Sequence, residues 1–136
     1  MKLLLDTHTL LWWLDGDDRL SKRARLAIGD ASTNVFVSAA SAWEIATKVR
    51  IGKLPGAVEV AERFAEIGNE QDFRSLRISV EHARAAGPMP GWHRNPFDGM
   101  LIARSQIERL ALVSNETLFD HWRIPVSYPR RCPGLV

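Results

Sequence analysis

The stretch Lys2-Leu3-Leu4-Leu5-Asp6, near the start of the chain, is a short apolar run that an acidic residue closes. An unbroken apolar run of this length predicts a strand that is buried on both faces of a sheet. Residues 34–38 form a second run, rich in β-forming residues, and predict a second strand. Further strands are expected at residues 75–78, 110–114 and 124–127, and the proline in the last run predicts an edge strand.

Segments with the apolar spacing of helices separate these runs. The clearest is residues 96–110, where Asn95 can cap the helix and Pro96 takes its first position. Because apolar strands alternate with helices, we expect a parallel sheet of roughly five strands covered on both faces, a three-layer α/β/α sandwich. Residues 1–136 are expected to form a single domain. The other expected helices are residues 7–14, 21–28, 41–49, 57–69 and 80–86.

The bulk properties exclude several classes of protein. The chain has 136 residues, a net charge of +2 and a pI of about 9.0, so it is only mildly basic, and it has no long basic run. Its single cysteine, Cys132, cannot form an internal disulfide, which favours a cytoplasmic location. Neither a signal peptide nor a run of about 18 apolar residues is visible, so we expect no membrane partner.

Acidic residues that lie far apart in the sequence fall at one edge of the expected sheet. Asp6 follows the first strand directly, Glu44 is expected in the first turn of the helix after the second strand, and Glu116 follows the fourth strand. Asp98 is expected at the start of the helix that leads into that fourth strand, and such crossover helices begin where the strands end. In a sheet of this type ligands bind at the carboxyl ends of the strands.

Clustered carboxylates repel one another unless a cation lies between them. Mg²⁺ and similar hard divalent ions prefer oxygen ligands and are commonly held by a few carboxylates together with water and phosphate. A metal in such a site can polarise a scissile phosphate and assist the attack of water. The pattern therefore predicts a metal-dependent phosphodiesterase that needs no histidine base.

Each acid also has a purely structural explanation. Glu44 ends a four-residue capping-box pattern that begins with a serine, and it can also pair with Lys48 one turn later. Asp98 and Glu116 lie near expected helix starts, where the helix dipole favours negative charge. Asp6 is harder to explain in this way, because an acid that ends a buried strand needs solvent or a cation. The joint placement of the acids favours a site.

Four ordered segments resemble the motifs of PIN-domain ribonucleases, in particular the VapC-type toxins of bacterial toxin–antitoxin pairs. They are Leu4-Leu5-Asp6-Thr7-His8, the Ser-Ala-Ala-Ser-Ala-Trp-Glu-Ile of residues 38–45, Asn95-Pro96-Phe97-Asp98, and the Leu-Val-Ser-Asn-Glu of residues 112–116. The resemblance extends from about residue 2 to residue 128. Each segment alone is a weak indicator of the family, whereas the four segments in this order are a specific one.

This resemblance implies a ribonuclease that uses Mg²⁺ or Mn²⁺ and leaves 5′-phosphate ends. Asp6 and Asp98 would bind the metal directly, and Glu44 and Glu116 would complete the catalytic site directly or through water. The resemblance also implies a homodimer, a VapB-type antitoxin as partner, and tRNA or rRNA as substrate. These partners rest on the resemblance alone.

The sequence departs from the family pattern in two places. The fourth motif more often carries Asp than Glu116, and Asp120, one turn later, is an alternative fourth acid. In the third motif Asn95 and Gly99 replace an acid and an arginine. Thr7 and Ser114 are candidate supporting hydroxyls, and the residues expected to contact RNA are Lys48, Lys53, Trp92, Arg94 and Arg104.

Three alternatives to a nuclease remain. A receiver domain or aspartyl-phosphate phosphatase would need paired acids before Asp6 or a second Asp two residues after it, and the sequence has neither. A non-catalytic PIN-like module that binds nucleic acid or protein would keep the fold without cleavage. In the third alternative the acids are helix caps and nothing more, and their substitution should not raise the stability of the metal-free protein.

Overall fold

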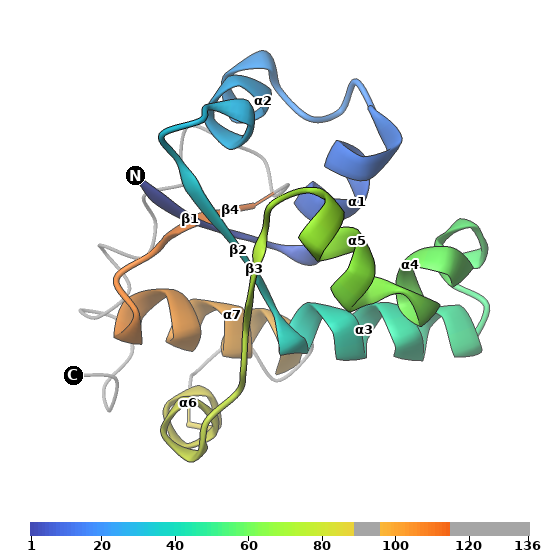
Figure 1. The fold of residues 1–136 in the computed structure, drawn as a ribbon. Coiled ribbons are helices and arrows are strands. Elements are labelled where there is room, and N and C mark those ends of the chain that lie inside the picture. The colour runs from blue at the N-terminus through green and yellow to red at the C-terminus, as the bar shows by residue number, and fades with distance from the viewer. Residues whose placement is uncertain (89–95, 115–136) are drawn as a thin grey trace.

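A computed structural model of the chain describes residues 1–88 and 96–114 (Figure 1). Its centre is a sheet in the order β3-β2-β1-β4, and each neighbouring pair is parallel. The parallel α/β fold expected from the sequence is therefore confirmed. The expected strand at residues 124–127 lies outside the described residues. The strands are β1 (Lys2–Leu5), β2 (Asn34–Ser38), β3 (Arg74–Leu76) and β4 (Ala111–Val113).

Helices cover both faces of this sheet. In Figure 1, α1 and α2 lie on one side of the strands, and α6 and α7 lie on the other. None of the helices in residues 1–88 and 96–114 combines the length and the apolar character that crossing a bilayer requires. The helical elements are α1 (Thr7–Asp15), α2 (Lys22–Gly29), α3 (Ala39–Arg50), the 3₁₀ turn η1 (Pro55–Ala57), α4 (Val58–Glu62), α5 (Phe64–Glu70), α6 (Val80–Ala86) and α7 (Pro96–Ile107).

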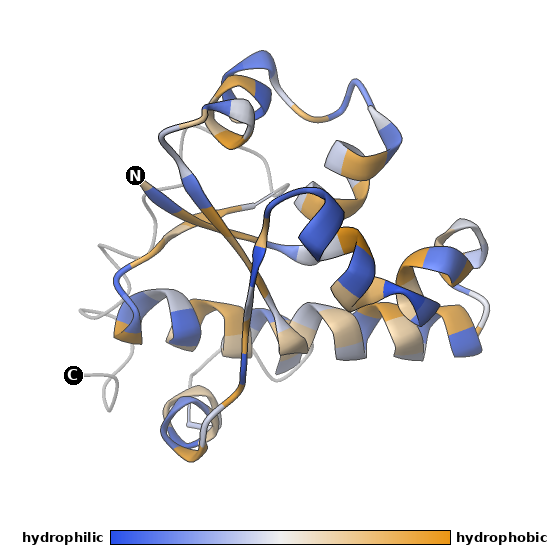
Figure 2. Ribbon diagram, viewed as in Figure 1, coloured by the Kyte–Doolittle hydropathy of each residue, from blue (hydrophilic) through white to orange (hydrophobic). Residues whose placement is uncertain are grey.

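The alternation of side chains along β1 divides the core into two clusters. Leu3 and Leu5 pack with residues of β2 and of α1 to α5 on one face, while Leu4 packs with α7 on the other. Figure 2 shows the same pattern as apolar strands between helices that are apolar on one side. Because β1 is buried on both faces, its unbroken leucine run identifies it as a central strand.

Several helix boundaries differ from those expected, among them a break at Arg63 and the end of α7. The single helix expected at residues 57–69 is wrong, because the backbone at Arg63 leaves the helical region (φ −118°, ψ 30°) and separates α4 from α5. The Arg63 guanidinium then pairs with Glu59 of α4 and with Glu66 and Glu70 of α5, which ties the two short helices together. The last helix ends at Ile107 rather than at residue 110, because Arg109 turns the chain with a positive φ of 55°.

Candidate active site

The site is built around the point where the strand order reverses. From β1 the chain adds β2 and β3 on one side and returns to the other side of β1 to add β4. Asp6 follows β1 at this point, and its backbone N–H donates to the carbonyl of Val113 at the end of β4, at 2.9 Å. In open α/β sheets this reversal, at the carboxyl ends of the strands, is where ligands bind.

The Asp6 side chain also caps the helix that follows. One of its carboxylate oxygens accepts a hydrogen bond from the backbone N–H of Thr9 at 2.8 Å, and the side chain is almost fully buried. A carboxylate at this position is favoured by the positive end of the α1 dipole. The cap fixes the orientation of Asp6 at the end of the strand.

Thr7 joins this strand end to α3. Its hydroxyl lies 2.6 Å from Oε1 of Glu44 and 3.2 Å from the hydroxyl of Ser41, and these three side chains are all buried. The other carboxylate oxygen of Glu44, Oε2, accepts from the Lys48 ammonium at 2.5 Å. We refer to Asp6, Thr7, Ser41, Glu44 and Lys48 as the strand-end cluster.

The capping role expected for Glu44 is wrong. The helix begins at Ala39, two residues earlier than expected, because the hydroxyl of Ser38 accepts from the backbone N–H of Ala40 at 3.0 Å and caps it. Glu44 therefore lies in the second turn, facing inward, and satisfies no backbone donor at the helix start. The alternative pairing with Lys48 is present.

Asp98 enters the same region from α7. It lies in the first turn of that helix and is half-buried. The neighbouring Phe97 ring packs edge-on against the Trp43 ring of α3, with centroids 4.9 Å apart, and Figure 1 shows the first turns of α3 and α7 meeting. Asp98 thus directly follows Phe97, whose ring packs against Trp43, and Trp43 is the residue before Glu44 on α3.

The other residues expected at the site lie in different environments or outside the described residues. Lys53 is exposed just after α3, and Ser114 is half-buried just after β4. Arg104 is buried, with a guanidinium nitrogen 2.8 Å from Nδ1 of His82, so the expectation that it contacts RNA from the surface is wrong. The expected fourth acids Glu116 and Asp120, and the expected RNA contacts Trp92 and Arg94, lie outside the described residues.

Sequence reasoning missed one part of the site. Ser38 and Ser41, spaced three residues apart where β2 passes into α3, both bury their hydroxyls completely. The sequence predicts Ser41 only as the start of a capping box and Ser38 only as the first residue of the second PIN-like motif. The signal that could have found it is the presence of two serines beside an acid at one strand end. Because buried hydroxyls need hydrogen-bond partners, this pattern indicates a polar cluster there.

The chemistry of the donors fits a hard divalent cation. The buried polar groups contributed by Asp6, Thr7, Ser41 and Glu44 all offer oxygen, the ligand atom that Mg²⁺ and Mn²⁺ prefer. Among residues 1–88 and 96–114, no three His, Cys, Asp or Glu side chains are grouped closely enough to hold a metal ion. A metal held by Asp6, Glu44 and Asp98 therefore stays a prediction.

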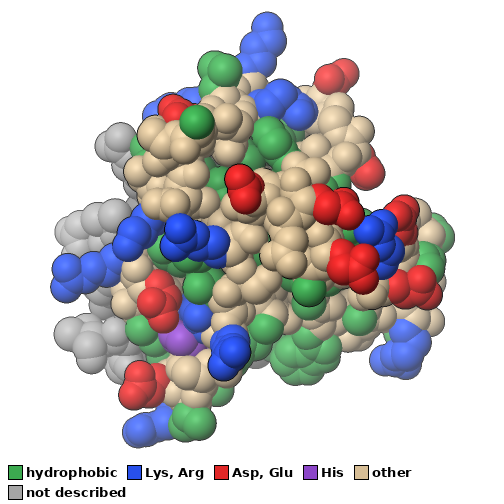
Figure 3. Space-filling view, viewed as in Figure 1, with side chains coloured by type: hydrophobic (Ala, Val, Ile, Leu, Met, Phe, Trp, Pro, Cys, Tyr) green, Lys and Arg blue, Asp and Glu red, His purple; other side chains and the backbone are tan. Residues whose placement is uncertain are grey.

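Charged side chains on the visible face do not point to a competing site. Figure 3 shows Lys and Arg scattered over this face rather than gathered in one patch. The acidic side chains at the right of the view surround a basic one, and α4 and α5 carry the pairs of Arg63 with Glu59, Glu66 and Glu70. Arg63 at the centre of that acidic group pairs with all three glutamates and offsets part of their charge.

Two comparisons with known proteins bear on this arrangement. Residues 3–124 match the model of the PIN domain. A segment of 66 residues is 38% identical to Ribonuclease VapC16 of Mycobacterium tuberculosis, covering 46% of this chain and 43% of that protein. The likeness thus spans less than half of the relative's length. Because the PIN domain match extends over nearly the whole chain, the protein belongs to the PIN domain family.

Proposed function

We propose that this protein is an endoribonuclease that hydrolyses RNA phosphodiester bonds with Mg²⁺ or Mn²⁺ and leaves 5′-phosphate ends. Membership of the PIN domain family supports a nuclease, and the partial likeness to Ribonuclease VapC16 supports RNA as the substrate. By the same likeness, we propose that it is the toxin of a VapBC-type pair in the cytoplasm. Its targets would be tRNA or rRNA.

The observation that carries this proposal is the burial of Asp6 and Glu44 at the strand ends. Asp6 and Glu44 come from different elements, and Thr7, the residue after Asp6, holds Glu44 by its hydroxyl. Two buried acids are costly unless a cation or hydrogen bonds compensate them. Their position is the one where ligands bind in this type of sheet.

The roles we assign follow from the positions of these residues. Asp6 and Asp98 would hold the metal, Glu44 would complete the site, and Glu116 or Asp120 would supply the fourth acid. A divalent cation there would stabilise the negative charge that develops on the scissile phosphate. Thr7 and Ser114 would orient the acids by hydrogen bonds.

Contacts to the RNA backbone would come from cations around this edge. We assign these to Lys48, Lys53 and Arg94, with Trp92 as a surface for base stacking. Arg104 has no part in this surface because it is buried. A homodimer and a VapB-type antitoxin that blocks the groove complete the proposal.

Cleavage of total cellular RNA by the purified protein tests the proposal. We expect discrete fragments with 5′-phosphate ends in Mg²⁺ or Mn²⁺, and their loss in EDTA and in the Asp6→Asn and Asp98→Asn variants. The matched control is Asp15→Asn, which removes the same charge from the exposed far end of α1 and should cleave like the wild type.

One observation favours a second candidate, a PIN-like module that binds RNA or protein without cutting. Both carboxylate oxygens of Glu44 already have partners within the chain, Thr7 and Lys48, so its burial does not require a metal. In that case the folded, antitoxin-free protein binds RNA but produces no metal-dependent fragments. That result would make the binding module the better description.

A further inference from the structure

The pair formed by Glu44 and Lys48 has an asymmetry that the proposed function leaves unexplained. The Glu44 side chain is only 2% exposed, whereas that of Lys48 is 24% exposed. The second partner of the carboxylate, the Thr7 hydroxyl, is buried at 2.6 Å. One partner of this carboxylate is therefore fixed, and the other reaches it from the edge of the protein.

The two partners differ in their freedom to leave. The Lys48 ammonium is carried on a flexible four-carbon chain, and a retreat into solvent would restore its hydration. Thr7 follows Asp6 in the first turn of α1 and is buried, so its short, β-branched side chain has little freedom to withdraw. A cation that binds Glu44 at Oε2 therefore competes with the Lys48 ammonium, while Thr7 keeps Oε1 in position.

We propose that Lys48 is an internal counter-ion of Glu44, which compensates the buried carboxylate in the metal-free protein and is displaced when a divalent cation binds. This inference rests on the proposed function only for the presence of a metal at the strand-end cluster. The displaced ammonium is then free to contact a phosphate of the RNA. Metal binding and substrate binding would thereby be coupled through one side chain.

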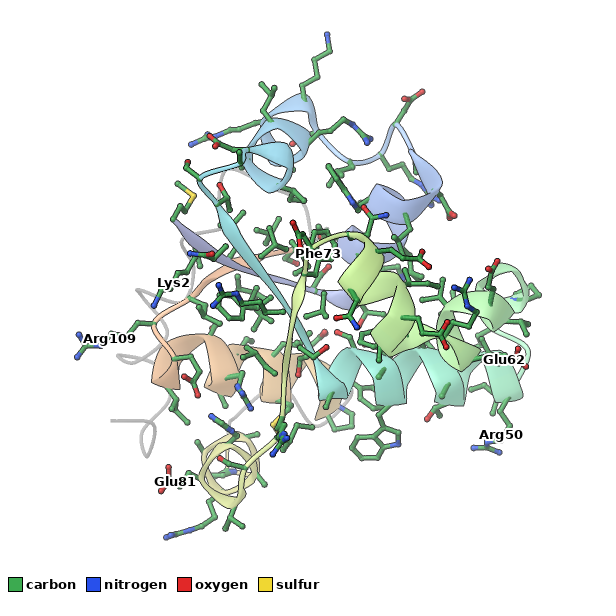
Figure 4. The ribbon with its side chains drawn as sticks, viewed as in Figure 1. Lys2, Arg50, Glu62, Phe73, Glu81 and Arg109 are labelled. Carbon is green, nitrogen blue, oxygen red and sulfur yellow. The ribbon has the colours of Figure 1, made fainter. Side chains whose placement is uncertain are left out.

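The first test measures the affinity of the antitoxin-free protein for Mn²⁺ by isothermal titration calorimetry. Lys48→Met keeps most of the apolar length of the side chain and removes the competing charge, so we expect Mn²⁺ to bind about fivefold more tightly than in the wild type. Arg50→Met is the matched control. It removes the same charge from the exposed end of α3, where Arg50 points away from the protein in Figure 4, and should leave the affinity unchanged within about twofold.

A double variant tests whether Lys48 acts through Glu44. In a Glu44→Gln background, Lys48→Met should no longer tighten Mn²⁺ binding, because the carboxylate for which the two cations compete is gone. If Lys48→Met tightened Mn²⁺ binding equally in both backgrounds, Lys48 would act only by long-range electrostatic repulsion of the cation. That result would overturn the proposal.

A second measurement uses the unaltered protein and does not depend on the folding of any variant. Acetylation of lysines by a limiting reagent, read by mass spectrometry, reports whether the Lys48 amine is free. We expect Mg²⁺ to raise the acetylation of Lys48 several-fold, because breaking its ion pair with Glu44 frees the amine to react. The acetylation of the exposed Lys53, which lies just after the same helix, should stay constant.

The outcomes separate this inference from the proposed function. If the wild type binds Mn²⁺ but Lys48→Met binds it no more tightly, and Mg²⁺ leaves Lys48 acetylation unchanged, the counter-ion role is wrong while the metal site stands. If the wild type binds no Mn²⁺ at all, the proposed metal site fails, and this inference fails with it.

Discussion

Two clusters of hydrogen-bonded polar side chains in this protein have buried members, and they differ in where they lie on the sheet. The strand-end cluster occupies the carboxyl ends of β1 and β2, whereas a second cluster joins α6 to α7 on the opposite face of the sheet from α1 and α2. The second cluster, which we call the helix-joining cluster, consists of Ser79, His82, Arg104 and Glu108.

The helix-joining cluster has the features often used to recognise an active site. Nδ1 of the buried His82 accepts from the Ser79 backbone N–H at 2.9 Å and from Arg104 at 2.8 Å, which assigns the proton to Nε2, facing Glu108 at 3.1 Å. Burial lowers the pKa of the Arg104 guanidinium, and the Glu108 carboxylate opposes this. Yet most of these groups pair with one another between two helices, although Nε of Arg104 has no hydrogen-bond partner among the described residues.

The difference shows that buried charge alone does not mark a catalytic site. The position relative to the carboxyl ends of a parallel sheet is the more informative feature, because helix dipoles and backbone groups converge there. The strand-end cluster meets this condition at the reversal of strand order through Asp6, whereas Ser79 of the helix-joining cluster follows the edge strand β3, away from that reversal. We therefore expect substitutions in the first cluster to change activity and substitutions in the second to change stability.

The largest expected effect is on cleavage. Asp6→Asn should lower the rate of RNA cleavage by about 10³-fold, the order expected when a metal ligand is lost, while His82→Ala should leave the rate per folded molecule unchanged within about twofold. Asn also caps helices well, so the substitution isolates the charge. Without metal, the variant should be at least as stable as the wild type, because repulsion among the acids is relieved.

The next effect is on stability and separates two residues of the helix-joining cluster. His82→Ala should lower the free energy of unfolding by about 3 kcal/mol, because it leaves the buried guanidinium and the Ser79 N–H without their acceptor. Arg104→Met should cost less than about 1 kcal/mol, because a buried charge can often be replaced by an apolar side chain of similar volume. Urea unfolding measures both. If the two variants lost the same free energy of unfolding, the contribution of His82 would come from packing alone and not from its role as a hydrogen-bond acceptor.

A smaller effect is expected where a hydroxyl positions Glu44. Thr7→Val should lower the cleavage rate by about 10- to 100-fold, as for other groups that orient a metal ligand. Thr9→Val is the matched control: Thr9 is also buried in α1, and within the part of the chain that the structure describes its hydroxyl has no hydrogen-bond partner. If both variants cleave at the same reduced rate, the loss reflects a change in α1 rather than in Glu44.

The smallest expected effect concerns an exposed pair outside both clusters. The Arg19 guanidinium and backbone N–H, by hydrogen bonding, hold the pKa of Asp17 at about 2, below its usual 3.8. A carboxyl whose pKa is lowered in the folded state stabilises the fold at pH values above its usual pKa. This stabilisation is lost as the pH falls through the lowered pKa. The difference in Tm between the wild type and Asp17→Asn should therefore shrink between about pH 4 and pH 2. A difference that is constant over this range would contradict the assignment.

Much of the fold could be predicted from the sequence because the signals are local. The leucine run of β1, and the Pro96 that opens α7, depend only on neighbouring residues. The boundaries at Ala39 and Arg63 could not be predicted in this way. At Ala39 two serines compete to cap the helix, and Ser38 prevails because it ends β2. At Arg63 the break is stabilised by ion pairs to three glutamates on two helices.

The candidate site was only partly predictable. The placement of Asp6 after β1 follows from topology, because the carboxyl ends of parallel strands share one edge. The burial of Arg104 was not visible, because its partner His82 lies 22 residues away on another helix. Trp43 is 59% exposed, because the helix start at Ala39 gives the inner face to Ser41, Glu44 and Ile45.

The dependence of stability on Mn²⁺ tests most directly whether the strand-end acids serve a metal. At about 100 times its dissociation constant, a metal bound only by the folded protein stabilises it by about 2.7 kcal/mol. We predict a rise of this order for the wild type and for Asp15→Asn, and little rise for Asp6→Asn at the same concentration. An equal rise in Asp6→Asn, or none in the wild type, would contradict a metal site at Asp6.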